Sequence, residues 1–421
     1  MNQTETPAGS QSAQVEETQS TRGFLAIWIG QAVSVFGSEL AQFALIWHLT
    51  VQSRSAIVLT LATLTQMLPR TLLGPIIGVW IDRWNRRYVM QIADALTASV
   101  TMALVVLFYL GLAQIWHIYV LLFAAALGQM MHASAFTAST TLMVRTDRLT
   151  RVGGLNQILE GITRILAPPA GALLIESLPI QTILSIDVAT ALVAVTPLFF
   201  VHVPQPAHGT TGEPASLWQD VKSSLEYVWG WRGLAIVTGI STTVNFLLVP
   251  AFSLLSLIVL EGFEGGARQL GWMEGAFGIG ILTGGALLGV GGGLKSRIDT
   301  VIVGTGLLGL MMVVVGAVPA NGILVAMGAM FVAGVGLSVG NGGGQTLLQM
   351  LIVPDMQGRV FATLAALRSL MAPLGLALAG PFTDRNGAQL WMLCAGISIT
   401  VMVAAMRFIP EVASIEEHER S

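Results

Sequence analysis

Apolar stretches long enough to cross a lipid bilayer recur along almost the whole chain, with only short polar breaks between them. A helix needs about 20 mostly apolar residues to span the hydrocarbon core. The composition agrees with repeated spans, because 54% of the 421 residues are hydrophobic and only 10% are charged, whereas soluble domains carry about 25% charged residues. The sequence therefore excludes a soluble domain held by a single anchor.

The apolar runs predict an all-α membrane protein with about twelve transmembrane helices in two six-helix bundles. The first bundle (23–203) has expected helices at 24–49, 56–80, 88–111, 116–140, 152–177 and 182–203. The second bundle (233–410) has them at 233–260, 270–290, 300–318, 322–345, 359–380 and 388–408. We further expect a disordered tail (1–22), a linker with an amphipathic helix (204–232) and a short final tail (411–421).

The distribution of lysine and arginine predicts the orientation of the chain. Short cytoplasmic loops of membrane proteins are enriched in these residues. With the N-terminus inside, 14 of the 20 basic residues fall in cytoplasmic segments. We therefore expect a multi-pass plasma-membrane protein with both termini in the cytoplasm.

The loop after the second predicted helix carries the most specific motif, Gly78-Val-Trp-Ile-Asp82-Arg83-Trp-Asn-Arg86-Arg87. It resembles the signature loop of the major facilitator superfamily, except that asparagine replaces a glycine. The resemblance implies that Asp82 and the three arginines latch the two halves together on the cytoplasmic side in one state. The alternative is that the arginines only fix topology and contact anionic lipid.

The fifth and eleventh predicted helices carry an internal repeat. With one fixed offset, Arg164-Ile-Leu-Ala-Pro168-Pro-Ala-Gly171 aligns with Arg368-Ser-Leu-Met-Ala-Pro373-Leu-Gly375. The fifth helix also resembles the antiporter signature of the superfamily, although other small residues replace several of its glycines. We expect these six residues on interface helices, with the two arginines at equivalent depths in the two halves.

The resemblance to the superfamily extends from about residue 23 to 410, and its overall character is that of the macrolide-efflux branch. It implies a central cavity lined by helices one, four, seven and ten. The cavity candidates on those helices, besides Glu39, are Phe43, Met130, His132, Asn245, Phe246, Met327 and Phe331. Methionine and aromatic side chains form adaptable apolar walls, although the same residues also fill ordinary helix bundles.

Glu39 is the candidate proton carrier, because it lies near the middle of a predicted cavity-lining helix. Burial favours the neutral acid, whereas a nearby arginine favours the carboxylate. Arg70, at similar depth on the next predicted helix, is the nominated partner. The alternative is a permanent structural ion pair between Glu39 and Arg70.

Glycine patterns at 304–309 and 289–296 imitate nucleotide-binding motifs but lack the strand, helix and glycine positions that those motifs require. Glycines four residues apart are better explained by close helix packing. The pairs and the triplet are Gly280 and Gly284, Gly285 and Gly289, and Gly336, Gly340 and Gly344.

The sequence predicts a secondary transporter that exports amphipathic or lipophilic small molecules, such as macrolide-like drugs, by proton antiport. Alternatives are export of a specific metabolite or siderophore, or solute uptake. An enzyme or a receptor is disfavoured, because no nucleophile or metal constellation and no sizeable soluble domain is evident. The expected partners are a small-molecule substrate, protons and lipids, with no cofactor, metal or nucleic acid, and a monomeric state.

Overall fold

The computed structural model describes residues 8–74, 77, 84–201 and 217–413, and over these ranges the chain is helical without strands. The first half contains α1 (Ala8–Ser53), α2 (Ala56–Leu68), η1 (Pro69–Leu73), α4 (Arg86–Tyr109), α5 (Ile115–Met143), α6 (Thr146–Ser177) and α7 (Ile180–Phe200). The second contains α8 (Leu217–Gly230), α9 (Arg232–Ser253), α10 (Leu255–Leu257), η2 (Ile258–Gly262), α11 (Ala267–Gly291), α12 (Arg297–Ala317), η3 (Ala320–Gly322), α13 (Ile323–Leu351), α14 (Pro354–Asn386), α15 (Ala388–Ala405), η4 (Met406–Phe408) and α16 (Pro410–Ala413).

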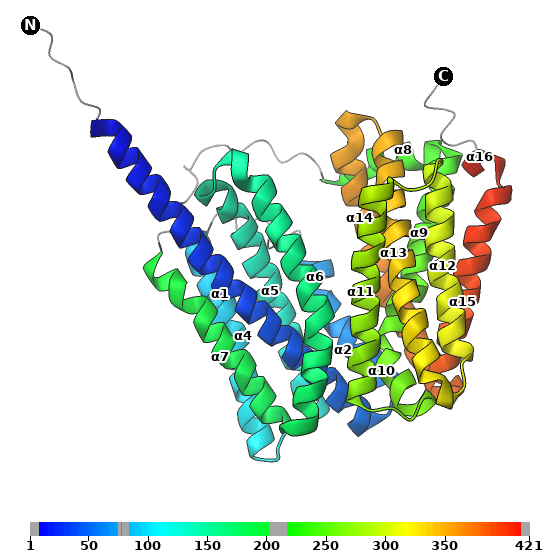
Figure 1. Cartoon of the computed structure of the whole chain (residues 1–421), viewed down its shortest axis with the longest axis horizontal. Helices are drawn as coiled ribbons and strands as arrows, with labels where there is room; N and C mark the ends of the chain where they lie inside the picture. The colour runs from blue at the N-terminus through cyan, green and yellow to red at the C-terminus, as the bar shows by residue number, and fades with distance from the viewer. Residues whose placement is uncertain (1–7, 75–76, 78–83, 202–216, 414–421) are drawn as a thin grey trace, which may run out of the picture. The chain divides into compact units, whose positions relative to one another are not determined.

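Twelve of the helices in the described ranges are long and apolar enough to cross a membrane. They coincide with the twelve spans predicted from hydropathy, so the predicted all-α membrane architecture is confirmed. The agreement follows from the physics of the bilayer, where a helix satisfies its own backbone hydrogen bonds. Figure 1 shows these long helices with short connections between them.

The chain divides into two compact units, which are described separately. Unit 1 comprises residues 1–42, 68–163 and 178–209, and unit 2 comprises residues 43–67, 164–177 and 210–421. In unit 1, α4 packs against both α5 and α7. A core cluster there contains Phe24, Ile27, Val89, Met90, Ala135, Met143, Val152 and Leu198.

A buried carboxylate joins three helices of unit 1. Asp187 of α7 accepts hydrogen bonds from Ser38 of α1 at 2.7 Å and from Thr101 of α4 at 3.2 Å. Buried polar groups are costly unless they are hydrogen-bonded. The two hydroxyl donors therefore explain how an acidic residue is accommodated inside a bundle.

In unit 2, successive helix pairs pack in the order α11, α13, α12, α15, α9 and α14. The short helix α8 packs against both α9 and α14, and α16 also packs against α9. A core cluster at this end of unit 2 contains Val228, Leu234, Leu348, Ile352, Val360 and Leu364. Apolar burial thus anchors α8, the helix of the predicted linker, to the neighbouring membrane helices.

Glycine packing inside unit 2 confirms part of the sequence prediction. A Cβ atom added at Gly280 or Gly284 would overlap the backbone of α13, and one added at Gly336 or Gly340 would overlap α12. The prediction is wrong for Gly285, Gly289 and Gly344, where an added Cβ would meet at most ordinary van der Waals contacts. A residue next along the helix is turned by about 100°, so a four-residue spacing alone does not say which face is packed.

Prolines free backbone carbonyl groups that glycines of neighbouring helices approach. Proline cannot donate to the carbonyl four residues earlier, so Pro250 leaves the carbonyl of Phe246 without its helical partner. Gly375 of α14 packs directly on that carbonyl. Such close approaches allow Cα–H···O contacts that a side chain would block.

The same arrangement occurs where α6 meets α11. An added Cβ at Gly275 would lie 3.3 Å from the carbonyl oxygen of Ile165, which Pro169 leaves free, and 2.9 Å from the Pro169 ring. Gly171, on the same segment, packs on the ring of Phe43. These contacts explain why residues 43–67 and 164–177 belong to the compact unit formed by the later helices.

Three helix boundaries differ from the sequence expectation. α1 begins at Ala8, inside the predicted tail 1–22, and a helix that is already nucleated extends at little cost. The second span continues from α2 into a π-helical turn, η1, which contains Arg70. The seventh ends at Ser253 and continues through α10 and the π-helical η2.

Candidate functional site

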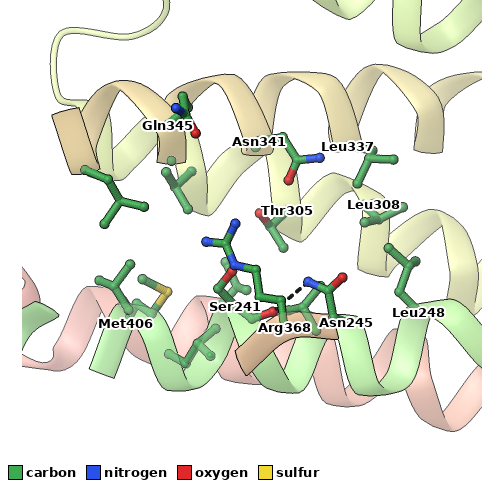
Figure 2. Close-up of a pocket in the computed structure, with 18 residues that line it drawn as sticks. Ser241, Asn245, Leu248, Thr305, Leu308, Leu337, Asn341, Gln345, Arg368 and Met406 are labelled. Carbon is green, nitrogen blue, oxygen red and sulfur yellow. Dashed lines mark hydrogen bonds between the residues drawn. The ribbon is translucent and has the colours of Figure 1, made fainter. Parts of the chain in front are cut away.

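A cavity of about 430 Å³ lies inside unit 2 (Figure 2). This volume is within the range of small-molecule pockets, about 300–1,000 Å³. The cavity is bounded by α9, α12, α13, α14 and the α15–η4 segment. Its lining residues are Val237, Ile240, Ser241, Val244, Asn245, Leu248, Val301, Thr305, Leu308, Leu337, Gly340, Asn341, Gly344, Gln345, Leu348, Arg368, Val403 and Met406.

Two pairs of polar residues face this cavity from opposite helices. Ser241 and Asn245 stand four apart on α9, and Asn341 and Gln345 stand four apart on α13. Residues with this spacing share one face of a helix. Asn245 donates from Nδ2 to the carbonyl oxygen of Ser241 at 3.0 Å, which fixes the orientation of its amide. Neutral hydrogen-bonding groups therefore line the cavity from both sides.

Arg368 brings a positive charge to the cavity from α14. Figure 2 shows its guanidinium group extending away from its own helix, toward the helix that carries Asn341 and Gln345. The side chain is half-buried, and within the described part of the chain its buried Nε atom has no hydrogen-bond partner. Arg164, its partner in the sequence repeat, is instead exposed on α6. The two arginines thus occupy different environments.

The predicted cavity residues fall in both units, and Asn245 is the one that lines the cavity in unit 2. Phe246 offers its carbonyl to Gly375, Phe43 is buried against Gly171, and Met327 and Phe331 are half-buried on α13. In unit 1, Met130 and His132 are half-buried on α5. A single wall formed by these residues remains a prediction.

The nominated proton-coupling residues both belong to unit 1. Glu39 is half-buried on α1, and Arg70 is exposed in the π-helical turn η1. Single-turn π-helices inside membrane spans occur frequently at functional sites. The assignment of a role to either residue stays a proposal.

A second group of ionisable residues lies inside unit 1. Asp94 of α4 accepts a hydrogen bond from Gln31 of α1 at 3.1 Å. The Nε2 atom of His132, on α5, lies 3.8 Å from the same carboxylate oxygen, and it makes no hydrogen bond within the described residues. His132 also stacks on Phe136. The sequence did not predict that these residues lie close together, because no motif links positions on three different helices.

Two arginines of the predicted latch make contacts inside unit 1, whereas Gly78, Asp82 and Arg83 lie outside the described residues. Arg86 donates to the carbonyl oxygen of Ala138 near the end of α5, at 2.6 Å. Arg87 donates to the carbonyl oxygens of Leu198 and Phe199 in the last turn of α7, at 2.5 and 2.6 Å. Within the described residues, the two carbonyl groups in the last turn of α7 have no helical partner, and Arg87 supplies one with a charge that is favourable at a helix C-terminus.

We expect Arg87→Ala to destabilise unit 1, because the last turn of α7 loses two charge-assisted hydrogen bonds. The loss should be about 2 kcal/mol, since a hydrogen bond to a charged group contributes about 1.5–3 kcal/mol and this side chain is partly exposed. The measurement is the apparent melting temperature of the purified protein in detergent. Arg148→Ala, at an exposed arginine early in α6, is the matched control. Equal melting temperatures for the two variants would contradict the capping role.

Sequence reasoning missed Ser241, Thr305, Asn341 and Gln345 as cavity residues. The usable signal was the occurrence of uncharged polar residues four apart inside apolar spans, where each buried polar group needs a reason. Among the described residues, no group of three or more His, Cys, Asp or Glu side chains could hold a metal ion. Cys394 is exposed and free.

Comparison with known proteins extends these observations. A sequence profile described as Major Facilitator Superfamily matches residues 27–376. Macrolide efflux protein A of Streptococcus pyogenes is 30% identical over 394 residues, which is 93% of this chain and 97% of that protein. Multidrug efflux pump Tap of Mycobacterium tuberculosis is 26% identical over 379 residues, covering 86% of this chain and 87% of that protein.

Solved structures of transporters share the fold at low sequence identity. The nucleoside transporter NupG superimposes with a TM-score of 0.67 at 13% identity and covers 91% of this chain and 98% of its own. A bacterial homologue of the iron transporter ferroportin, in an inward-facing state, superimposes with a TM-score of 0.66 at 16% identity and equal coverage. At these identities the similarity establishes the fold alone.

Proposed function

The chain belongs to the major facilitator superfamily, and we propose that it exports amphipathic or lipophilic small molecules, macrolide-like drugs among them, by proton antiport with alternating access. The observation that carries the proposal is the 30% identity to a protein named for macrolide efflux, which extends over 93% of this chain. The similarity to a multidrug efflux pump supports the same direction of transport. The family and the fold are those of transporters and not of enzymes.

The test is a drug-susceptibility panel, with macrolides included, in cells that lack their own efflux pumps. Expression of the protein should raise resistance to some of these compounds, and collapse of the proton gradient should remove the gain. Resistance that persists without the gradient would exclude proton antiport. A panel without any gain would favour the alternatives, which are export of a specific metabolite or siderophore, or solute uptake.

We place the protein as a monomer in the plasma membrane with both termini in the cytoplasm, in contact with membrane lipids. The excess of lysine and arginine in the predicted cytoplasmic segments supports this orientation. Reporter fusions after residue 421 and within 204–216 should both report the cytoplasm. An external signal from either fusion would reverse the assignment.

Proton coupling is assigned to Glu39 and Arg70. Glu39 suits the role because it is half-buried on α1, away from the ends of the span, and an ionisable residue inside a membrane is costly unless it has a task. The Asp94 and His132 group is the second candidate, supported by the 3.8 Å distance between the carboxylate and the imidazole.

The loop from Gly78 to Arg87 is assigned the role of a latch that stabilises one conformational state. We expect Asp82→Asn to reduce export strongly while the amount of protein in the membrane stays near that of the wild type. The substitution removes a carboxylate but leaves the three arginines, which set topology. Export assays and quantitative blots on the same cells measure both quantities. If this variant exports as well as the wild type, the latch assignment is wrong, and the arginines only fix topology and contact lipid.

A further inference from the structure

The cavity in unit 2 combines one positive charge with an uncharged wall. Arg368 is the only ionisable residue among the 18 that line it in the described structure, and none of them is acidic. Leu248, Leu308 and Leu337 form an apolar surface at one end of the cavity (Figure 2). The lining therefore provides no group that could neutralise the guanidinium.

An arginine without a counter-ion is unfavourable in such a place. A charge within a membrane span is costly unless it has a partner or a task. The buried Nε atom of Arg368 adds an unmade hydrogen bond, and an unsatisfied buried donor is most costly when it belongs to a charged group. A bound anion would reduce both costs. The positive charge of the cavity therefore favours the binding of an anion.

We propose that this cavity is a substrate site for amphipathic organic monoanions, in which Arg368 binds the carboxylate and the leucine-lined end holds the apolar body. The proposal rests on the proposed function, export of amphipathic small molecules, and adds organic monoanions, bound in this cavity, as a class of substrate besides the macrolide-like drugs. A guanidinium group suits a carboxylate because its planar array of donors matches the two oxygens. The amides of Asn341 and Gln345 offer further donors on the facing helix.

A monoanion fits better than a phosphate dianion. One arginine balances one negative charge, and the other polar groups that line the cavity are neutral hydroxyls and amides. A second negative charge would stay uncompensated in this cavity, which is costly. A cationic ligand would face repulsion from Arg368. The charge of the ligand is therefore the property by which this cavity should discriminate.

Cholate and its methyl ester test the proposal, because they share one apolar body and differ in the charge of a single group. Binding of each compound is measured on purified full-length protein in lipid nanodiscs, at concentrations below micelle formation. We expect the wild type to bind cholate at least about tenfold more tightly than the ester, since truncating or neutralising one partner of a buried charge pair costs this much or more. Equal affinities in the wild type would overturn the proposal without any variant.

Arg368→Gln should weaken cholate binding by about tenfold or more and leave binding of the ester nearly unchanged. Arg368→Lys should restore part of the affinity, because it keeps the charge but loses the planar fork. Arg385→Gln is the matched control, since Arg385 is exposed in the last turn of the same helix. Cholate affinity that is unchanged by Arg368→Gln, or lowered equally by Arg385→Gln, would overturn the assignment.

The outcome can be separated from a failure of the proposed function. A drug panel without resistance, together with cholate binding that depends on Arg368, would remove drug export and leave the anion site. Drug resistance together with indifference to the charge of the ligand would remove the anion site and leave drug export.

Discussion

Replacing Gly375 with alanine is expected to lower the stability of the protein strongly and to reduce the yield of folded material. The added Cβ atom would overlap the carbonyl oxygen of Phe246 and lie 3.1 Å from the ring of Pro250. Both neighbours are fixed, one as backbone and one as a ring closed on the backbone, so α9 and α14 would have to separate. Overpacking of this kind costs about 1–3 kcal/mol and occasionally more, and we expect the upper end of that range.

Gly358→Ala is the matched control on the same helix. An added Cβ at Gly358 meets nothing within 4 Å, and alanine is favoured over glycine inside a helix by about 1 kcal/mol. The control should therefore fold as well as the wild type or better. Monodisperse yield by size-exclusion chromatography and the apparent melting temperature measure both variants. Similar values for Gly375→Ala and Gly358→Ala would show that α9 and α14 are not tightly packed at this point.

The twelve spans were predictable from the sequence because the bilayer imposes one simple requirement. Each span needs a long apolar run, and hydropathy records that requirement directly. Helix irregularities were less accessible. The chain after Ser253 leaves the regular α-helical path, whereas Pro250 lies inside α9 without ending it, as proline in a membrane span often does when neighbours satisfy the freed carbonyl. Only the packing of the surrounding helices decides between these outcomes.

The sequence predicted that glycines would allow close helix packing, but it identified only some of the glycines at which helices touch. Gly280 and Gly285 stand in similar four-residue patterns, yet an added Cβ at Gly280 would meet backbone of α13, whereas one at Gly285 would meet only the Ser338 hydroxyl at 3.6 Å. The difference lies in the rotation of α11 about its axis. That rotation is set by all contacts of the helix together, and a local pattern does not contain it.

The candidate cavity shows the same limit for polar residues. The sequence singles out Arg368 as an ionisable residue inside a span and Asn245 as a cavity residue, and the structure brings both to one cavity. It does not predict that Thr305 joins them. Thr305 lies on α12, which is the ninth predicted span, and the resemblance to the superfamily places only spans one, four, seven and ten around the central cavity. Residues from five helices meet there through tertiary packing alone.

The largest functional effect is expected from Glu39→Gln, which should abolish export driven by the proton gradient. Glutamine preserves the size and much of the hydrogen-bonding capacity of the side chain but cannot carry a proton in exchange for substrate. Substrate binding should therefore remain, while its dependence on pH disappears. Efflux from inverted vesicles or whole cells with an imposed gradient measures the gradient-driven export, and equilibrium binding at a series of pH values measures the pH dependence.

Asp94→Asn provides the decisive comparison for this last prediction. The amide can still accept the hydrogen bond that Gln31 donates to Asp94, so the contact between α1 and α4 is retained while the charge near His132 is removed. If Glu39 carries the proton, Asp94→Asn should keep gradient-driven export within about threefold of the wild type, a change of less than 1 kcal/mol. The reverse pattern, in which Glu39→Gln exports normally and Asp94→Asn does not, would transfer proton coupling to the Asp94 and His132 group. Because both residues belong to unit 1, either result would leave the proton carrier and the proposed anion cavity in different parts of the chain, and proton antiport would then require coupling between the two sites.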